Sequence, residues 1–299
     1  MLKRFVGGAL VAGLLAAIGV GKATAAPVVF TIDSTKSLIA LSGSMVSGDI
    51  NAPSLTIALL SQSFAPNSTQ NITNSLQTRY GGTITAQYSS SADTITFLGA
   101  SAVANNGGSY RPNDFAASST ARSQANYGGR IDIPSLGGAE LALRQLIASV
   151  TSGVIPMSGP NYNWTFASTA QGLGLTQGRI DYAGSGSIGG ALGTGTFDLV
   201  GNTSLNQSTT AGSLVLVGPT TNATATLTVP IRIRFAQTIL GGDTPVGTDD
   251  IFVDLLLAGQ LVAVAVVPEA SSLVMLGLVG SVVGYVGYRR RNKKTEVEA

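Results

Sequence analysis

Apolar and polar residues alternate along much of the chain between residues 26 and 267. The clearest segment is 231–235, where two Arg separate three apolar residues, and segment 83–88 shows the same period of two. Because successive side chains of a strand point to opposite faces, this alternation predicts half-buried β-strands. Shorter apolar runs between turn residues predict further strands at 28–32, 38–41, 55–60, 94–98, 197–200, 214–217, 223–229, 251–257 and 261–266. The pattern as a whole indicates an all-β fold, either a β-sandwich or a jelly roll.

One segment departs from this alternation and predicts a short helix. Between residues 136 and 150, apolar side chains recur at three- and four-residue spacing, and Glu140 stands four residues before Arg144. The preceding stretch, 100–129, is rich in Ala, Ser, Asn and Gly and predicts a long connection. The apolar positions of the expected helix are Leu136, Ala139, Leu143, Leu146, Ile147 and Val150.

The first 25 residues have the pattern of a secretory signal peptide. Lys3 and Arg4 precede an apolar stretch over 5–20, and Ala23 and Ala25 supply the small residues that signal peptidase recognises. We expect cleavage before Ala26. The alternative is an uncleaved N-terminal anchor.

A second apolar segment, 272–288, contains no charged residue and is just long enough to predict a transmembrane helix. A basic cluster follows it and is expected to stop transfer and remain in the cytoplasm, which places residues 26–267 outside. This region therefore becomes an exported passenger. The cluster consists of Arg289, Arg290, Arg291, Lys293 and Lys294.

The sequence Val267-Pro268-Glu269-Ala270 stands directly before this segment. A Pro-Glu motif, an apolar span and a terminal Arg cluster, in this order over 268–299, resemble the PEP-CTERM sorting signal of exopolysaccharide-producing Gram-negative bacteria. The usual motif reads Val-Pro-Glu-Pro, so Ala270 departs from it. The resemblance implies that an exosortase recognises Val267, Pro268 and Glu269 in a membrane-anchored precursor, whose passenger then reaches the cell surface or the extracellular space. A plain single-pass anchor is the alternative.

Composition narrows the chemistry of the passenger. The chain contains no Cys and no His, which excludes disulfides, thiolate or imidazole metal sites and Ser-His-Asp catalysis. Only 11% of its residues are charged and the net charge is +2, which does not favour nucleic-acid binding. A Gly-x-Gly-x-x-Gly sequence at 184–189 is not followed by the helix that a dinucleotide site needs, so no cofactor is predicted.

Three groups of residues are candidates for binding. Tyr162, Trp164 and Phe166 alternate with polar residues and would form a sugar-stacking platform if exposed, although burial in the core is the favoured interpretation. Arg232 and Arg234 are candidates for binding an anionic polymer. The favoured interpretation is that their charges, on the solvent-exposed face of a strand, prevent edge-to-edge aggregation. The third group is a weak calcium candidate whose alternative is a solvated acidic loop, and it contains Asp243, Asp249 and Asp250.

These observations predict an exported, non-enzymatic structural or adhesive protein of an exopolysaccharide matrix. Its expected partners are signal peptidase and exosortase during processing, the membrane through its tail, and exopolysaccharide. A secreted carbohydrate-binding module is the alternative function. A secreted hydrolase that uses two carboxylates is a third, although no spacing singles out such a pair.

Overall fold

The computed structural model describes residues 26–49, 52–61, 75–89, 92–105, 125–133, 135, 137–166, 171–187, 193–201, 203–205, 210–217, 223–240 and 251–267. One compact unit comprises Pro27–Gly218 and Ala223–Val267. The other comprises Met1–Ala26, Pro219–Asn222 and Pro268–Ala299, and of these only Ala26 is described. The predicted signal peptide and sorting tail therefore lie outside the described residues.

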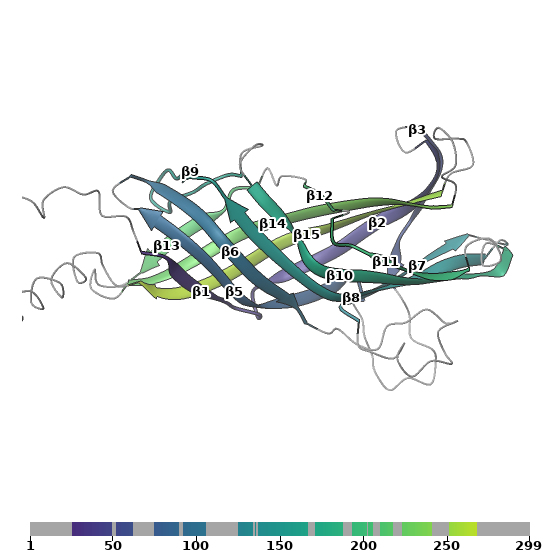
Figure 1. The fold of residues 1–299 in the computed structure, drawn as a ribbon, viewed down its shortest axis with the longest axis horizontal. Helices are drawn as coiled ribbons and strands as arrows, with labels where there is room; N and C mark the ends of the chain where they lie inside the picture. Colours follow the sequence, from purple (N-terminus) through teal and green to yellow (C-terminus); the bar gives the residue numbers. More distant parts are fainter. Residues whose placement is uncertain are drawn as a thin grey trace, which may run out of the picture. The chain divides into compact units, whose positions relative to one another are not determined.

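The compact unit confirms the all-β prediction: its strands belong to one sheet of 15 strands (Figure 1). They are β1 Val28–Ile32, β2 Leu38–Asp49, β3 Ala52–Ala58, β4 Leu60–Ser61, β5 Gln77–Ser89, β6 Thr94–Ala104, β7 Tyr127–Ile133, β8 Gly137–Ser152, β9 Ile155–Pro156, β10 Gln171–Ser185, β11 Thr194–Asp198, β12 Thr203–Leu205, β13 Ser213–Val217, β14 Ala223–Leu240 and β15 Ile251–Val267.

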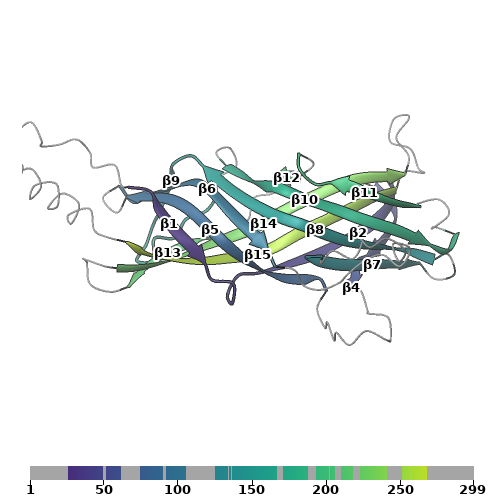
Figure 2. The ribbon, with the colours of Figure 1, turned by 60° about the horizontal axis from the view of Figure 1, so that its bottom comes forward.

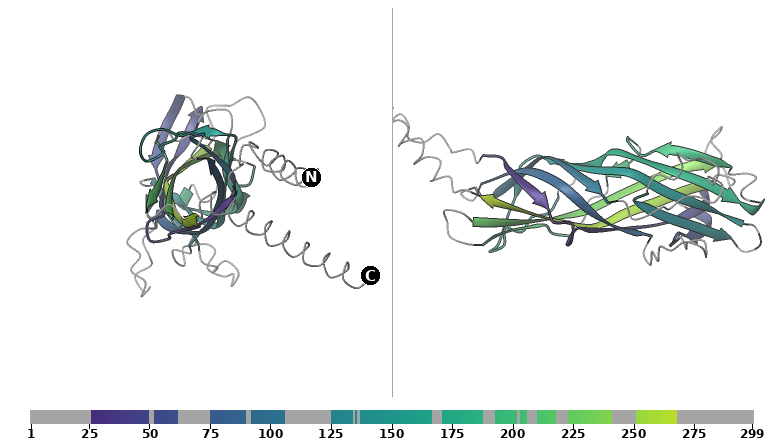
Figure 3. Two further views of the ribbon diagram at one scale, coloured as in Figure 1. Left: turned by 90° about the vertical axis from the view of Figure 1, so that its left-hand side faces the viewer. Right: turned by 90° about the horizontal axis from the view of Figure 1, so that it is seen from below.

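The sheet curves around a shared core (Figures 2 and 3). Its main path runs β11-β10-β8-β6-β5-β1-β15-β14-β12, and β10 and β12 near the two ends of this path also contact each other. The remaining strands extend the sheet locally: β2 pairs with β15, β3 and β5, β7 pairs with β8 and β4, β13 pairs with β14, and β9 pairs with β6. Neighbouring strands are antiparallel throughout these pairings.

The longest strands unite segments that the sequence predicts as separate. β14 joins 223–229 to 231–235, and β15 joins 251–257 to 261–266. Pro230 does not interrupt β14, although proline has no backbone N–H to donate. On the side of β14 away from β15, β13 pairs only before Pro230 and β12 pairs only after it, so at Pro230 this side is an edge that needs no N–H donor. The alternation continues across the proline, and its core-facing residues are Leu227, Val229, Ile231, Ile233 and Phe235.

The predicted helix over 136–150 is wrong, because the structure places strand β8 there. Gln145 has a φ of 56° and interrupts the pairing of β8 with β10. Leu141 and Leu143 face the core before this irregularity and Leu146, Ala148 and Val150 face it afterwards. Two stretches of period two that are offset by one residue therefore imitate helical spacing.

The predicted connection over 100–129 is also shorter than expected. β6 continues to Ala104 and β7 begins at Tyr127, while residues 106–124 lie outside the described residues. Residues 100–104, the first part of the expected connection, instead pair with residues 80–84 of β5.

The core contains a buried pair of tyrosines. The hydroxyl groups of Tyr80 and Tyr127 lie 3.3 Å apart, and the Tyr127 hydroxyl also donates to the carbonyl oxygen of Ile39 at 3.1 Å. Burial disfavours the charged phenolate, so it raises the pKa of both residues well above the ordinary value of 10. The hydroxyl groups are therefore protonated hydrogen-bonding groups in the folded protein.

The first and last strands of the unit pair directly. β1 lies between β5 and β15, with Thr31 opposite Val264 and Ile32 opposite Ala263. Since the pairing is antiparallel, the beginning of β1 and the end of β15 lie at the same end of the sheet.

Candidate functional site

Charged side chains gather on the face of β7, β8, β10 and β11 that is opposite the core. Strand pairing places Arg130 opposite Glu140, and Arg179 opposite both Arg144 and Asp198. The neighbouring positions on the other face carry core residues such as Leu143, Ile180 and Phe197. In a chain with so few charges, this face is the first candidate for a functional site.

The centre of the face is a buried ion pair. Nε of Arg144 lies 2.6 Å from Oδ2 of Asp181, and their side chains are 1% and 9% exposed. The Thr196 hydroxyl donates to Oδ1 of Asp181 at 3.0 Å, and Nε of Arg179 lies 3.4 Å from the same oxygen. Both carboxylate oxygens are thus engaged, and the pair connects β8, β10 and β11.

This arrangement holds strands together more readily than it performs chemistry. A general acid or base must exchange a proton with a substrate, and a nucleophilic carboxylate needs an accessible oxygen. The carboxylate of Asp181 instead accepts hydrogen bonds from Arg144 on β8 and Thr196 on β11, and it lies in ion-pair distance of Arg179 on its own strand. At the edge of the face, Nε of Arg130 lies 3.1 Å from Oδ2 of Asp132 on the same strand.

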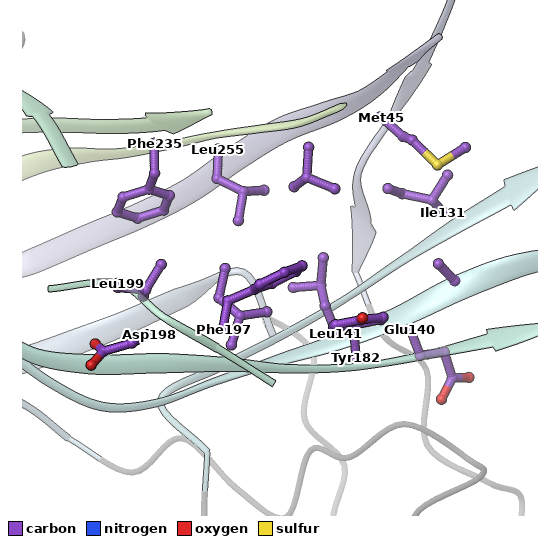
Figure 4. A pocket seen from close by; sticks show the side chains of 13 residues that line it. Met45, Ile131, Glu140, Leu141, Tyr182, Phe197, Asp198, Leu199, Phe235 and Leu255 are labelled. Carbon is purple, nitrogen blue, oxygen red and sulfur yellow. The ribbon is translucent and has the colours of Figure 1, made fainter. Parts of the chain in front are cut away.

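On the core side of the same strands lies a small apolar cavity (Figure 4). Its volume is about 30 Å³, far below the range of about 300–1,000 Å³ that small-molecule sites occupy. Tyr182 and Phe197 stack in its wall with ring centroids 4.9 Å apart. Figure 4 shows the Glu140 carboxylate pointing away from the apolar lining. The cavity is a packing defect at which β11 approaches β14 and β15, and it offers no room for a ligand.

The predicted aromatic stripe lies largely in the core. Trp164 is 2% exposed and Phe166 is 6% exposed, and both pack on Phe97 with centroids 5.1 and 5.8 Å away. Gly212 lies so close to the indole that a Cβ atom there would overlap the ring. Tyr162 is half-buried and is not on the same regular strand face. Two of the three rings are therefore inaccessible to a sugar.

The calcium candidates Asp243, Asp249 and Asp250 lie outside the described residues. Among the residues that are described, no group of three or more acidic side chains could hold a metal ion. The next acidic residue, Asp254, accepts from Arg234 through both oxygens, at 2.7 Å from Nε and 2.8 Å from Nη2. Hydrogen bonding to Asp254 raises the pKa of the Arg234 guanidinium.

Sequence reasoning missed the buried ion pair. It paired Arg144 with Glu140 along a helix, whereas the structure pairs Arg144 with Asp181, 37 residues away. A weak signal was the Arg179-x-Asp181 alternation, which puts both charges on one face of a strand. Nothing in the linear sequence indicates that β8 is their neighbour.

Within the described part of the chain, no helix is long and apolar enough to cross a membrane. No protein-family model, curated protein or solved structure matches the chain.

Proposed function

We propose that the chain is an exported cell-surface or extracellular-matrix protein, which an exosortase sorts and whose passenger has a structural or adhesive role. The observation that carries the proposal is a coincidence of boundaries. Signal cleavage is expected before Ala26 and the sorting motif begins at Val267, while the compact unit begins at Pro27 and ends at Val267, leaving out Pro219–Asn222. This agreement supports a passenger that folds independently of a removable leader and tail.

The interior of the passenger supports a structural role over a catalytic one. The cavity beneath β8 and β10 is too small for a substrate, and Asp181 and Asp254 are held by arginines. We infer a sandwich-like β passenger without enzymatic activity, displayed in an exopolysaccharide matrix. Signal peptidase and exosortase are its processing enzymes, and its precursor is anchored in the membrane by residues 272–288.

The carbohydrate-binding module with Tyr162, Trp164 and Phe166 as its platform has less support, because two of these rings are buried. The carboxylate hydrolase also has less support, since the described Asp181 and Asp254 are engaged in ion pairs.

Processing is tested by expression of the full-length chain in a host that has an exosortase, followed by intact-mass spectrometry of the exported protein. We expect a mass that lacks both the leader and the basic tail. Glu269→Ala should retain the tail, while the matched control Glu296→Ala, outside the motif, should be processed normally. An exported wild-type protein that still contains residues 289–299 would refute the proposal.

A further inference from the structure

A shallow polar hollow lies on the outer face of β14, β15 and β2, away from the charged face of β7, β8, β10 and β11. Its volume is about 400 Å³. Strand register brings its lining together: Arg234 on β14 pairs with Leu256 on β15, which pairs with Ser42 on β2. The hollow is lined by Ser42, Gly43, Arg232, Arg234, Asp254 and Leu256.

The two arginines of the hollow are in different electrostatic states. Arg234 is neutralised and oriented by its two hydrogen bonds to Asp254. Arg232 is exposed, and it has no acidic partner within 4 Å among the residues that the structure describes. The lining carries two positive charges against one negative charge, so its excess positive charge resides on Arg232.

We propose that this hollow binds a carboxylate-bearing sugar unit of an acidic polysaccharide, with Arg232 as the residue that recognises the carboxylate. A planar guanidinium matches a carboxylate with two parallel hydrogen bonds. The Ser42 hydroxyl can exchange hydrogen bonds with sugar hydroxyls, and Leu256 offers an apolar floor for the C–H face of a ring. The hollow has the size of a small-ligand site, unlike the cavity in the core.

This inference rests on the proposed function, because it specifies which matrix polymer the passenger would contact. The site chemistry selects the carboxylated class. A neutral polysaccharide has no negative charge to pair with Arg232. An acidic peptide has no sugar ring to place its hydroxyls on Ser42 and its C–H face on Leu256. Attraction by net charge alone would not need this arrangement.

The test measures binding of the purified full-length protein, in mild detergent, to polygalacturonate by biolayer interferometry. Its fully methyl-esterified form serves as the matched polymer without carboxylates, and polyglutamate and dextran sulfate serve as anions of other classes. We expect polygalacturonate to bind best and the ester to show no saturable binding. Arg232→Gln should weaken polygalacturonate binding about tenfold or more, the usual loss for a hydrogen bond between charged groups.

The matched control variant is Arg79→Gln, because Arg79 is also an exposed arginine but donates to the backbone carbonyls of Ser34 and Thr35 in the turn between β1 and β2 and does not line the hollow. It should change binding less than twofold, because Arg79 does not line the hollow and salt screens its charge at a distance. Thermal unfolding verifies that both variants fold, and Arg232→Lys provides a second variant that retains the charge without the planar fork and should bind with reduced affinity.

The inference is overturned if polygalacturonate does not bind, if polyglutamate or dextran sulfate binds equally well, or if both Gln variants lose affinity equally. These outcomes are independent of processing, because the binding assay uses the full-length chain. A retained tail in the mass measurement would refute the sorting proposal and leave the polymer measurement interpretable.

Discussion

Two arginine–aspartate pairs connect neighbouring strands in different regions of the sheet. Arg144 and Asp181 connect β8 to β10, and Arg234 and Asp254 connect β14 to β15, with closest N–O distances of 2.6 and 2.7 Å. Their environments differ greatly: the first pair is 1% and 9% exposed, and the second is 41% and 26% exposed. The two pairs have the same chemical groups but differ in their exposure to solvent.

The difference shows what burial demands of a charge. Removing a charge from water costs several kcal/mol, so a buried pair persists only when its remaining hydrogen-bonding capacity is satisfied. Asp181 accordingly also accepts from Thr196 and lies near Arg179. Asp254 needs no such support, because water reaches it. The buried pair therefore links β8 to β10 with support from β11, while the exposed pair remains accessible to solvent.

The comparison is tested most strongly by the isosteric substitution of each aspartate. Asp181→Asn leaves Arg144 charged and buried without its counterion, so the free energy of unfolding should fall by about 3–5 kcal/mol. The same change at Asp254 should cost about 1 kcal/mol or less. Urea denaturation followed by circular dichroism measures both. Equal losses would show that burial does not distinguish the two pairs.

Alkaline pH extends the comparison to the buried tyrosines Tyr80 and Tyr127. Because their pKa is raised in the folded state, the unfolded chain releases these protons first as the pH rises. The contribution of these two tyrosines to the free energy of unfolding is therefore fully present below about pH 10. Above this pH it should fall by about 1.4 kcal/mol per pH unit for each tyrosine. Urea midpoints between pH 9 and 11 measure the slope. Tyr80→Phe and Tyr127→Phe should each reduce it, and a slope that neither substitution changes would contradict its assignment to the buried pair.

The smallest expected effect concerns the exposed pair alone. A double-mutant cycle of Arg234→Gln and Asp254→Asn should give a coupling of about 0.2–1 kcal/mol. Addition of 1 M NaCl should reduce this coupling, because salt screens partly exposed charges. A coupling above about 3 kcal/mol that salt does not change would place this pair with the buried one and contradict the comparison.

Strands with clear alternation or a clear apolar run were predictable, whereas β7, β9, β10 and β12 were not predicted. β1 has the bounds that its apolar run predicts, and β13 differs by one residue. β8 could not be recognised, since the irregularity at Gln145 shifts its alternation by one residue. Irregularities of this kind depend on the neighbouring strand, and a single sequence does not contain that neighbour.

The features of the candidate sites also fall into two groups, those that the sequence pattern predicts and those that depend on strand order. Burial of Trp164 and Phe166 agrees with the favoured interpretation, because large rings stabilise the fold most when they are removed from water. The exposed Arg232 agrees with the predicted wet face of its strand. The Arg144–Asp181 pair and the hollow beside Ser42 depend on strand order, with β8 beside β10 and β2 beside β15. Strand order is set by long-range pairing and was not accessible to pattern analysis.

The pairing of β1 with β15 places the first and last residues of the folded unit beside each other. If the register of Thr31 with Val264 continues, it brings Val28 level with Val267, one strand spacing or about 4.8 Å away. A linker of a few residues could therefore join these ends, and a circular permutant could begin in a connection between other strands and still form the same sheet. The position at which synthesis starts is thus separable from the fold.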